Sequence, residues 1–294
     1  NEGHSTITNS YATGTVTGTN NYVGGLIGYN YKSTVTNSYA TGAATGTDQV
    51  GGLVGRHVND SSITNSYATG AVTGSSYVGG LVGVLAGTIT KSYATGAVTG
   101  SADLGGLVGY KESGTVTSSF YDRETTGRSD TGKGTPKTTA EMKTLATFSG
   151  AGWDIDGAGG TGKVWRMYEG DAYPLLRSFL TAATATVKND LIKVYDGSTT
   201  VAGGSHTWDI AVDEGKVFGT AVYTSASKNA GNRVVALTGL YSNQQGYDIK
   251  TQDGAVSITP KALAVDGTTA SDKTYDGNTN AAITVGTLSG FVGT

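Results

Sequence analysis

The glycine-rich segment 157–163 contains the residues of this sequence that come nearest to phosphate chemistry. It reads Gly-Ala-Gly-Gly-Thr-Gly-Lys, which matches a dinucleotide-binding fingerprint and most of a phosphate-binding loop. A phosphate-binding loop requires Ser or Thr after its Lys to hold Mg²⁺, and Val164 occupies this position. Both motifs also require a buried strand before the glycines and a helix after them, and neither flank has such a pattern. We therefore interpret the segment as a glycine-rich turn.

Metal-ion and nucleophilic chemistry have equally few candidate residues. Asp154 and Asp156 resemble the start of a calcium-binding loop, but the later ligands and the distal Glu of such a loop are absent. The histidines His4, His57 and His206 are isolated and do not have the spacing of metal ligands. The chain has no Cys, which excludes disulfides, thiolate catalysis and Cys-based zinc sites. We expect no catalytic residue, no cofactor and no metal site, and we do not expect an enzyme.

Composition limits the classes of partner. The chain has 294 residues, of which 47 are Gly, 3 are Pro and 15% are charged, and its formal net charge is -3. Nucleic-acid binding requires a basic stripe, so this charge argues against such a partner. No stretch of about 20 apolar residues is present, so we do not expect a membrane span. No signal peptide opens the sequence and its first residues lie at a repeat boundary, so we expect a piece of a longer protein.

A repeated stretch organises residues 1 to about 121. One copy reads Asn37-Ser-Tyr-Ala-Thr-Gly42 and is followed, after a Thr-rich run, by Gly51-Gly-Leu-Val-Gly55. An aromatic residue marks each copy, with steps of 28, 28, 26 and 27 residues: Tyr11, Tyr39, Tyr67, Tyr93 and Phe120. Self-similarity at such a period is the signature of a solenoid, a propeller or an array.

Within each copy the pattern predicts strands. Ile or Val alternates with Thr, as in Thr34-Val35-Thr36, which is the two-residue period of a strand. Three strand candidates per copy, such as 33–39, 43–45 and 49–54, are separated by glycine corners. Three strands and three corners make one coil, so we predict an all-β chain that begins with a right-handed parallel β-helix of about five coils. A propeller blade needs four strands and about 40–50 residues, which exceeds this period.

Coils stacked at about 4.8 Å place equivalent residues in columns. One apolar column is expected to face inward: Ile7, Val35, Ile63, Ile89 and Val116. The marker aromatics form a second column, and a third contains Val23, Val50, Val78 and Leu104. A column of Asn9, Asn37 and Asn65 predicts an internal row of hydrogen bonds, which Lys91 interrupts. Burial of each apolar side chain contributes roughly 1.5–3 kcal/mol, which no coil gains alone.

The pattern ends after the last coil and predicts a cap. We assign residues 1–128 to the β-helix and 129–180 to its C-terminal cap, which contains an aromatic cluster. A short helix is expected near 139–145, opened by a capping box between Thr138 and Glu141.

A second type of module follows the cap. We predict a β-sandwich-like module at 181–260 and the start of a second, truncated one at 261–294, because Tyr195-Asp-Gly197 recurs 80 residues later as Tyr275-Asp-Gly277. Both Asp-Gly pairs are expected to form turns, with Tyr195 and Tyr275 as core anchors. Residues 261–294 are too few to bury a full core, so we expect them to pack poorly or to complete themselves against a neighbour through exposed strand edges.

These motifs resemble known families. The Gly-Leu-Val-Gly coils with Ser-Tyr-Ala-Thr-Gly resemble the GLUG repeat, and segments 133–142 and 170–175 resemble the region that commonly closes such arrays. The Tyr-Asp-Gly motifs, together with Lys228-Asn-Ala-Gly231 and Gln245-Gly-Tyr-Asp248, are similar to YDG and MBG modules. The combination is typical of bacterial surface adhesins of the filamentous-haemagglutinin type, which are exported by two-partner secretion.

The resemblance implies a function. It predicts a structural and adhesive segment of a large secreted surface or biofilm-matrix adhesin, acting as stalk and binding surface. The implied location is extracellular, at the bacterial cell surface. The implied partners are a polysaccharide or a host or bacterial cell-surface receptor, and an outer-membrane export partner for the parent protein. The secretion domain of such proteins is not in this sequence.

Three alternative functions stay open. A carbohydrate-binding module is favoured by four aromatic candidates for a ligand-facing surface: Tyr22, Tyr29, Tyr31 and Tyr77. An ice-binding β-helix is the alternative suggested by an outward Thr-x-Thr array: Thr6, Thr8, Thr34, Thr36, Thr64, Thr88, Thr90, Thr115 and Thr117. Because Thr is a good strand residue on a solvated face, we predict that this array is an ordinary outer face of the sheet. A polysaccharide-cleaving enzyme would need two carboxylates that meet only in space, and no pattern singles out such a pair.

Overall fold

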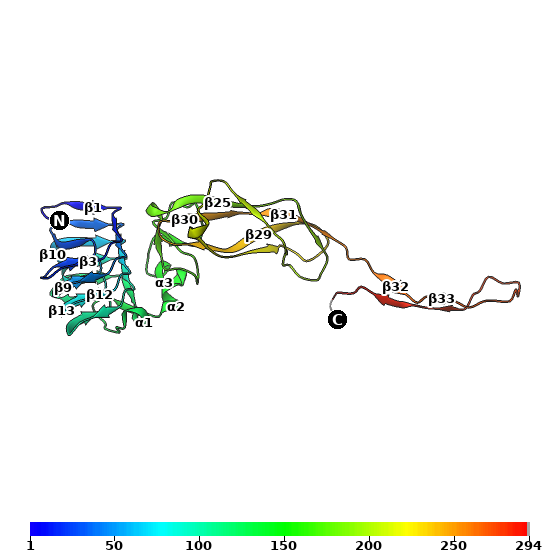
Figure 1. Ribbon diagram of the computed structural model, residues 1–294, viewed down its shortest axis with the longest axis horizontal. Coiled ribbons are helices and arrows are strands. Elements are labelled where there is room, and N and C mark those ends of the chain that lie inside the picture. The colour runs from blue at the N-terminus through cyan, green and yellow to red at the C-terminus, as the bar shows by residue number, and fades with distance from the viewer. Residues whose placement is uncertain (293–294) are drawn as a thin grey trace. The chain divides into compact units, whose positions relative to one another are not determined.

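The computed structural model describes residues 1–292 and is all-β, with 47% of residues in strands and 7% in helices. The chain groups into two compact units: residues 1–182 with 241–248, and residues 183–240 with those from 249 onward. The first unit begins with stacked parallel strands, blue to cyan in Figure 1. The predicted parallel β-helix is therefore confirmed as a β-solenoid.

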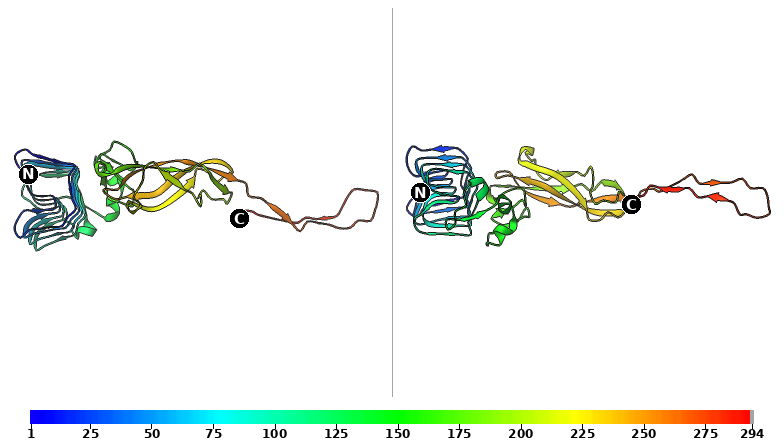
Figure 2. Two further views of the ribbon diagram at one scale, coloured as in Figure 1. Left: turned by 45° about the horizontal axis from the view of Figure 1, so that its top comes forward. Right: turned by 90° about the horizontal axis from the view of Figure 1, so that it is seen from below.

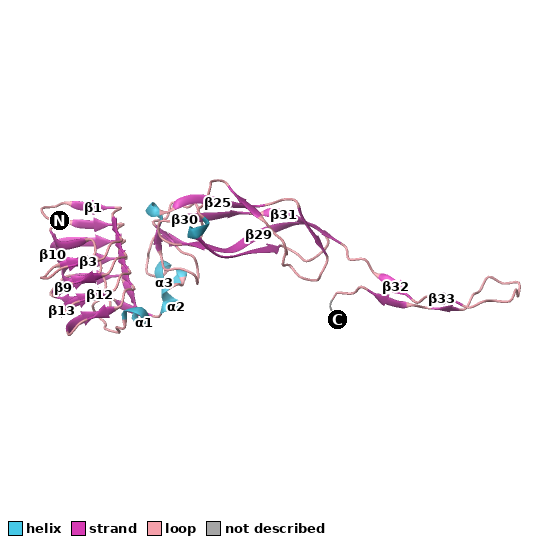
Figure 3. Cartoon of the chain, in the orientation of Figure 1, coloured by secondary structure: helices cyan, strands magenta, loops and turns pink. Residues whose placement is uncertain are grey.

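Four parallel sheets run along the solenoid (Figure 3). Sheet A contains β1 (Thr6–Thr8), β5 (Ile27–Tyr31), β6 (Thr34–Thr36), β10 (Val54–Thr64), β14 (Val82–Thr90), β18 (Val108–Lys111) and β19 (Thr115–Thr117). Sheet B contains β2 (Tyr11–Ala12), β7 (Tyr39–Ala40), β11 (Tyr67–Ala68), β15 (Tyr93–Ala94), β20 (Phe120–Asp122) and β21 (Thr135–Lys137). Sheet C contains β3 (Val16–Thr17), β8 (Ala44–Thr45), β12 (Val72–Thr73) and β16 (Val98–Thr99), and sheet D contains β4 (Val23–Gly24), β9 (Asp48–Gly51), β13 (Ser76–Gly79) and β17 (Ala102–Gly105).

Each coil has more strands than the three expected. The predicted strand 33–39 is divided because Asn37 adopts a left-handed φ of 48°, which turns the chain between β6 and β7. The predicted strand 49–54 is divided between β9 and β10 at a corner that only glycine permits. A Cβ on Gly51 would lie 2.0 Å from the carbonyl oxygen of Val54.

The solenoid has about four turns and not the five expected. A fifth turn begins with β19 and β20 but is not completed. Asp122, at the end of β20, accepts hydrogen bonds from the backbone N–H groups of Glu124 and Thr125 and caps helix α1 (Arg123–Thr126). This helix replaces the strand that would have extended sheet C.

The interior of the solenoid is filled by columns of apolar side chains. Val35, Ile63 and Ile89 are fully buried and lie in register in neighbouring strands of sheet A. Ile7 and Val116, at the two ends of this column, are partly buried against the same core. The column of Val23, Val50, Val78 and Leu104 packs in a separate apolar cluster. The predicted inward column is confirmed.

A column of buried serines supplies the internal hydrogen bonds between coils. The Oγ atoms of four serines each accept from the backbone N–H of the serine one coil earlier at 3.2 Å: Ser38, Ser66, Ser92 and Ser119. Each hydroxyl also donates to the carbonyl oxygen two residues before it, at 2.8 or 2.9 Å. Every hydroxyl therefore connects two coils and leaves no buried polar group of its own unpaired.

The expectation that asparagines form this row is wrong. Asn9, Asn37 and Asn65 instead hold left-handed turns with φ of 47° to 48°, and Oδ1 of Asn37 has no hydrogen-bond partner. Asn adopts this conformation at lower cost than most residues, which explains why it recurs there. Lys91 occupies the same turn with φ of 49°, so it continues the backbone pattern with a less suitable side chain.

The aromatic column lies on the outer side of sheet B and forms a second core. The rings of Tyr11, Tyr39, Tyr67 and Tyr93 stack with successive centroid distances of 5.3, 5.0 and 4.8 Å. The stack is covered by buried side chains from the region that follows the coils: Met142, Phe148, Trp153, Trp165, Met167 and Leu176. Figure 2 shows the coils stacked in register.

The region predicted as a cap has two roles. Residues 128–137 cover the last coil: Nζ of Lys133 donates to the carbonyl oxygens of Leu104 and Gly109, and β21 pairs with β20. The following elements cover the aromatic column: α2 (Thr139–Met142), α3 (Leu145–Ser149), β22 (Ile155–Asp156), β23 (Trp165–Arg166), β24 (Leu175–Leu176) and the 3-10 helix η1 (Arg177–Phe179). The capping box between Thr138 and Glu141 is confirmed.

The second unit contains most of a two-sheet module. One sheet has the order β27-β25-β30 and the other β26-β31-β29-β28. The bounds are β25 (Thr181–Val187), β26 (Leu191–Val194), β27 (His206–Trp208), η2 (Glu214–Lys216), β28 (Val217–Ser225), β29 (Gly231–Ser242), β30 (Tyr247–Gln252) and β31 (Gly254–Thr259). Gly197 has φ of 79°, so the first Asp-Gly pair forms the expected turn.

Residues 261–292 form two short antiparallel pairs and bury almost no side chains. The strands are β32 (Ala264–Asp266), β33 (Thr269–Ala270), β34 (Ile283–Thr284) and β35 (Thr287–Ser289). The expectation of poor packing is confirmed for these residues, while 293–294 of the predicted region lie outside the described residues. The role of Tyr275 as a core anchor is wrong, because its side chain is 94% exposed.

We expect Ser66→Ala to lower the free energy of unfolding by about 1–3 kcal/mol, because it leaves the buried N–H of Ser38 without an acceptor. Urea unfolding followed by circular dichroism measures the loss. Ser75→Ala, at an exposed serine, is the matched control and should have no effect. Equal stability of the two variants would contradict the role of the serine column.

Two buried polar side chains interrupt the apolar interior. Asn30 and His57 occupy paired positions of β5 and β10, with 2.9 Å between Asn30 Nδ2 and His57 Nδ1. Burial lowers the pKa of His57 from 6.5 to about 4, and backbone hydrogen bonds with Ser61 and Thr88 offset part of this effect. The next coil has Leu85 at the paired position.

We expect His57 to make stability fall between pH 6.5 and about pH 4. The unfolded chain binds a proton at His57 near pH 6.5, whereas the folded chain binds it only near pH 4. Stability is therefore complete above pH 6.5 and decreases as the pH falls, by about 3 kcal/mol for a pKa difference of this size. Urea unfolding across this range should show a smaller decrease in His57→Leu, and an unchanged decrease would refute the assignment.

Candidate binding face

The outer side of sheet A carries both sets of predicted surface residues. Strand alternation around the buried Asn30 turns its two neighbours, Tyr29 and Tyr31, outward in β5. Tyr29 is paired with Arg56 of β10, Arg56 with Val84 of β14, and Val84 with Tyr110 of β18. One row therefore crosses four coils, with a tyrosine at each end, and within it Val84 is buried at 2% exposure.

A second row lies beside it, along sheet D. Its first member directly precedes strand β4, and the others lie within β9, β13 and β17. Tyr22, Gln49, Tyr77 and Asp103 occupy this position in successive coils, and all four have a left-handed backbone, with φ of 64°, 56°, 55° and 50°. Such φ values are uncommon for residues other than Gly, Asn and Asp, and for a bulky side chain they are outliers. We call this the left-handed row.

The last glycine of each Gly-Leu-Val-Gly motif positions the left-handed row. A Cβ on Gly55 would lie 2.6 Å from the carbonyl carbon of Tyr22, and a Cβ on Gly109 would lie 2.6 Å from that of Tyr77. Only glycine allows the strand of one coil to pass this close to the turn of the coil before it. The motif therefore brings each left-handed residue against the outer row.

Six residues of the two rows, together with Tyr31 and Glu112, form an aromatic face, which we define as Tyr22, Tyr29, Tyr31, Tyr77, Tyr110, Arg56, Gln49 and Glu112. Ring centroids are 5.6 Å apart between Tyr22 and Tyr29 and 6.2 Å apart between Tyr29 and Tyr31, and the latter pair is nearly parallel. At the other end of the face, Tyr77 and Tyr110 are 5.4 Å apart. Tyr22 is 44% exposed and Tyr110 is 42% exposed, so both ends are open to solvent.

Polar groups connect the two aromatic groups. Arg56 donates to Oε1 of Gln49 at 2.8 Å and to Oε2 of Glu112 at 3.2 Å, with which it forms an ion pair. Nζ of Lys32 lies 5.3 Å from the ring centroid of Tyr31. The guanidinium is thus held at a fixed place between the tyrosines, and three of its five N–H donors remain for other acceptors.

The structure places the four predicted tyrosines in two groups and adds residues that the sequence analysis missed. Tyr22, Tyr29 and Tyr31 lie together, whereas Tyr77 lies with Tyr110. Tyr110 and Arg56 could have been identified from the sequence, because each directly follows the last glycine of a Gly-Leu-Val-Gly motif. Tyr29 directly follows the last glycine of the corresponding Gly-Leu-Ile-Gly motif in the first coil.

The predicted threonine array lies farther along the same sheet. Its rows are in register from β1 to β19, and each Thr flanks a residue of the inward column. The exposure is uneven: Thr6, Thr8, Thr88, Thr115 and Thr117 are exposed, whereas Thr34, Thr36, Thr64 and Thr90 are half-buried. Ser62 replaces Thr in the central coil and donates to Thr34. We continue to interpret the array as an ordinary outer face.

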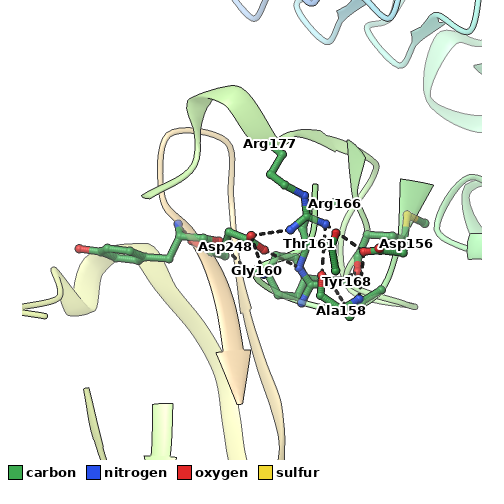
Figure 4. Close-up of polar contacts among 12 residues, drawn as sticks. Asp156, Ala158, Gly160, Thr161, Arg166, Tyr168, Arg177 and Asp248 are labelled. Atoms are coloured by element: carbon green, nitrogen blue, oxygen red, sulfur yellow. Dashed lines mark hydrogen bonds and ion pairs between the residues drawn. The ribbon is translucent and has the colours of Figure 1, made fainter. Parts of the chain in front are cut away.

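The glycine-rich segment 157–163 wraps a buried ion-pair cluster (Figure 4). Asp248 pairs with both Arg166 and Arg177, and it also accepts from the N–H of Gly160 at 2.9 Å. Arg177 pairs with Asp156 at 2.9 Å, and Arg166 lies 4.0 Å from the ring centroid of Tyr168. The side chains of Arg166 and Asp248 are each 6% exposed, so we interpret this buried ion pair as structural.

The residues that resemble metal and phosphate ligands make contacts within the protein. Asp154 pairs with Lys163 at 2.8 Å and Asp156 pairs with Arg177. Over residues 1–292, three or more His, Cys, Asp or Glu side chains nowhere meet in an arrangement that could hold a metal ion. Among the same residues no helix is long and apolar enough to cross a membrane.

Comparison with known families assigns the coils. The model of the GLUG motif matches three consecutive segments, 19–45, 46–73 and 74–99. These three segments of the coils match the GLUG motif. In each GLUG match the fourth residue belongs to the left-handed row: Tyr22, Gln49 and Tyr77. Of the other five members of the aromatic face, Tyr29, Tyr31 and Arg56 lie in these matches, and Tyr110 and Glu112 lie in the coil that follows them. The model of the YDG domain matches residues 259–294, which include the second Tyr-Asp-Gly motif.

One curated protein is similar to part of this chain. A protein of Evansella cellulosilytica named "Putative Gly-rich membrane protein" is 56% identical over 62 residues, which are 21% of this chain. The match covers 6% of that relative, so most of its length has no counterpart in the alignment. No solved structure matches this chain.

We expect Gly109→Ala to destabilise the last GLUG-like coil by about 1–3 kcal/mol, because the new Cβ would clash with the backbone of Tyr77 and Val78 at 2.6 Å. Thermal unfolding measures this loss. Gly14→Ala is the matched control, since nothing lies within 4 Å of its Cβ position. If both variants unfold at the temperature of the wild type, glycine does not position the left-handed row.

Proposed function

We propose that this chain is a structural and adhesive segment of a large extracellular bacterial surface protein. The GLUG motifs and the YDG domain support a repeat-containing, adhesin-like protein, and neither is an enzyme family. The observation that carries the adhesive part is the aromatic face, which is built on the repeats themselves. A surface built on repeats adds binding groups each time a coil is added.

The solenoid is suited to a stalk. Its coils are joined by parallel strand pairing, by the serine column and by the tyrosine stack. These contacts all connect one coil to the next, so the unit resists separation of its coils along the stack. In this proposal the partner is a polysaccharide or a cell-surface receptor rich in glycans.

Adhesion under flow tests this function. Beads coated with the chain should remain on a layer of bacterial exopolysaccharide at shear rates that remove beads coated with serum albumin. The same layer should release no reducing sugars on incubation with the chain, because no catalytic role is proposed. Retention no greater than that of albumin beads, or release of sugars that is lost on changing one carboxylate, would contradict the proposal.

A further inference from the structure

We propose that the aromatic face binds an extended, uncharged polysaccharide that lies along the solenoid axis across the coils. This inference rests on the proposed adhesive function and names its ligand class. The outer row crosses three coil spacings from Tyr29 to Tyr110, which is about 14 Å at about 4.8 Å per coil. This length accommodates several linked sugars but is long for a single one.

The side chains supply the two kinds of contact that a sugar ring needs. A pyranose has an apolar C–H face and a polar edge of hydroxyl groups. The tyrosine rings at each end offer apolar faces together with a hydroxyl group that can hydrogen bond. Between them, Arg56, Gln49 and Glu112 offer planar groups that donate to and accept from adjacent hydroxyls.

The backbone conformation indicates that the tyrosines of the left-handed row are kept for a function. A left-handed backbone costs an ordinary L-residue roughly 1–2 kcal/mol, and Asn or Gly would lower this cost. The solenoid uses Asn at another left-handed corner, at Asn37 and Asn65, yet Tyr22 and Tyr77 stand in the left-handed row. Strain of this kind is typical of binding sites whose surroundings hold the backbone in place.

Charge favours an uncharged ligand. Arg56 is paired with Glu112, and Lys32 lies over the ring of Tyr31. Within the face as defined, Arg56 is the one positive side chain and Glu112 the one carboxylate, so the two charges balance. An acidic polysaccharide would require an excess of positive charge, which this face does not have.

Binding of oligosaccharides to the whole chain tests the inference. The probes are unbranched neutral β-glucan oligosaccharides, with alginate oligosaccharides as the acidic comparison, measured by calorimetry. Tyr22→Ala and Tyr110→Ala should each weaken binding of a neutral probe about tenfold, which corresponds to about 1.4 kcal/mol. Tyr275→Ala is the matched control, because it removes an exposed tyrosine outside the face and should leave the affinity unchanged.

Several outcomes would overturn the inference. Affinity that is equal in the wild type and both face variants would refute it, as would binding of alginate alone with an affinity that falls steeply from about 0.05 M to about 0.5 M NaCl. Concentration-dependent self-association that both face variants abolish, without glycan binding, would identify a second copy of the chain as the occupant.

Unchanged circular dichroism of the variants establishes that their fold is intact. Beads that adhere in the flow assay equally well with and without Tyr110→Ala would refute only this inference and leave the adhesive function standing.

Discussion

Parallel strand pairing between neighbouring coils is the interaction on which the rest of the first unit depends. A coil buries its apolar side chains only against the coils beside it, so each column must keep one kind of environment along the stack. Val35, Ile63 and Ile89 show this constraint, since they are paired in register and have no exposed surface. A residue that fits one coil therefore recurs in the next.

The columns differ in how strictly they are constrained. Ser38 and Ser66 recur because each hydroxyl satisfies a backbone group of the neighbouring coil, and the corner glycines recur because a Cβ has no room. The left-handed row varies among Tyr, Gln and Asp, although its backbone conformation is constant. Variation in this row leaves the backbone unchanged, so a binding surface can differ there from one coil to another.

The two-residue alternation and the period near 27 residues made the solenoid and its inward column predictable, because both follow from strand geometry. The sequence did not reveal which polar column forms the hydrogen bonds, since Asn37 and Ser38 are neighbours and both recur. Only the backbone angle of Asn37 and the contacts of Ser38 separate a turn residue from a bonding one. The position of Asp122 as a helix cap, which ends the fifth coil, depends on local contacts in the same way.

The binding face was only partly predictable because it depends on which residues of different coils meet. Tyr29 and Tyr31 are two apart in one strand, so their shared orientation follows from alternation alone. The pairing of Tyr77 with Tyr110 depends on a left-handed turn and a glycine in the next coil, neither of which is visible as a strand pattern. The same is true of Tyr275, whose exposure depends on the absence of a covering sheet over the described residues 261–292.

The rigidity of the solenoid bears on how such a face would bind. A flexible surface must lose conformational entropy when its side chains are ordered, at roughly 0.5–1.5 kcal/mol for each mobile side chain. Here Arg56 is already held by Gln49 and Glu112, and the left-handed turns are fixed by close backbone contacts. Most of the conformational entropy of these side chains is therefore lost during folding and not on binding. Weak contacts to single sugars then add along the coils with little further loss of entropy. Affinity for a polymer should therefore increase with the number of coils that carry an aromatic or planar polar residue in the two rows.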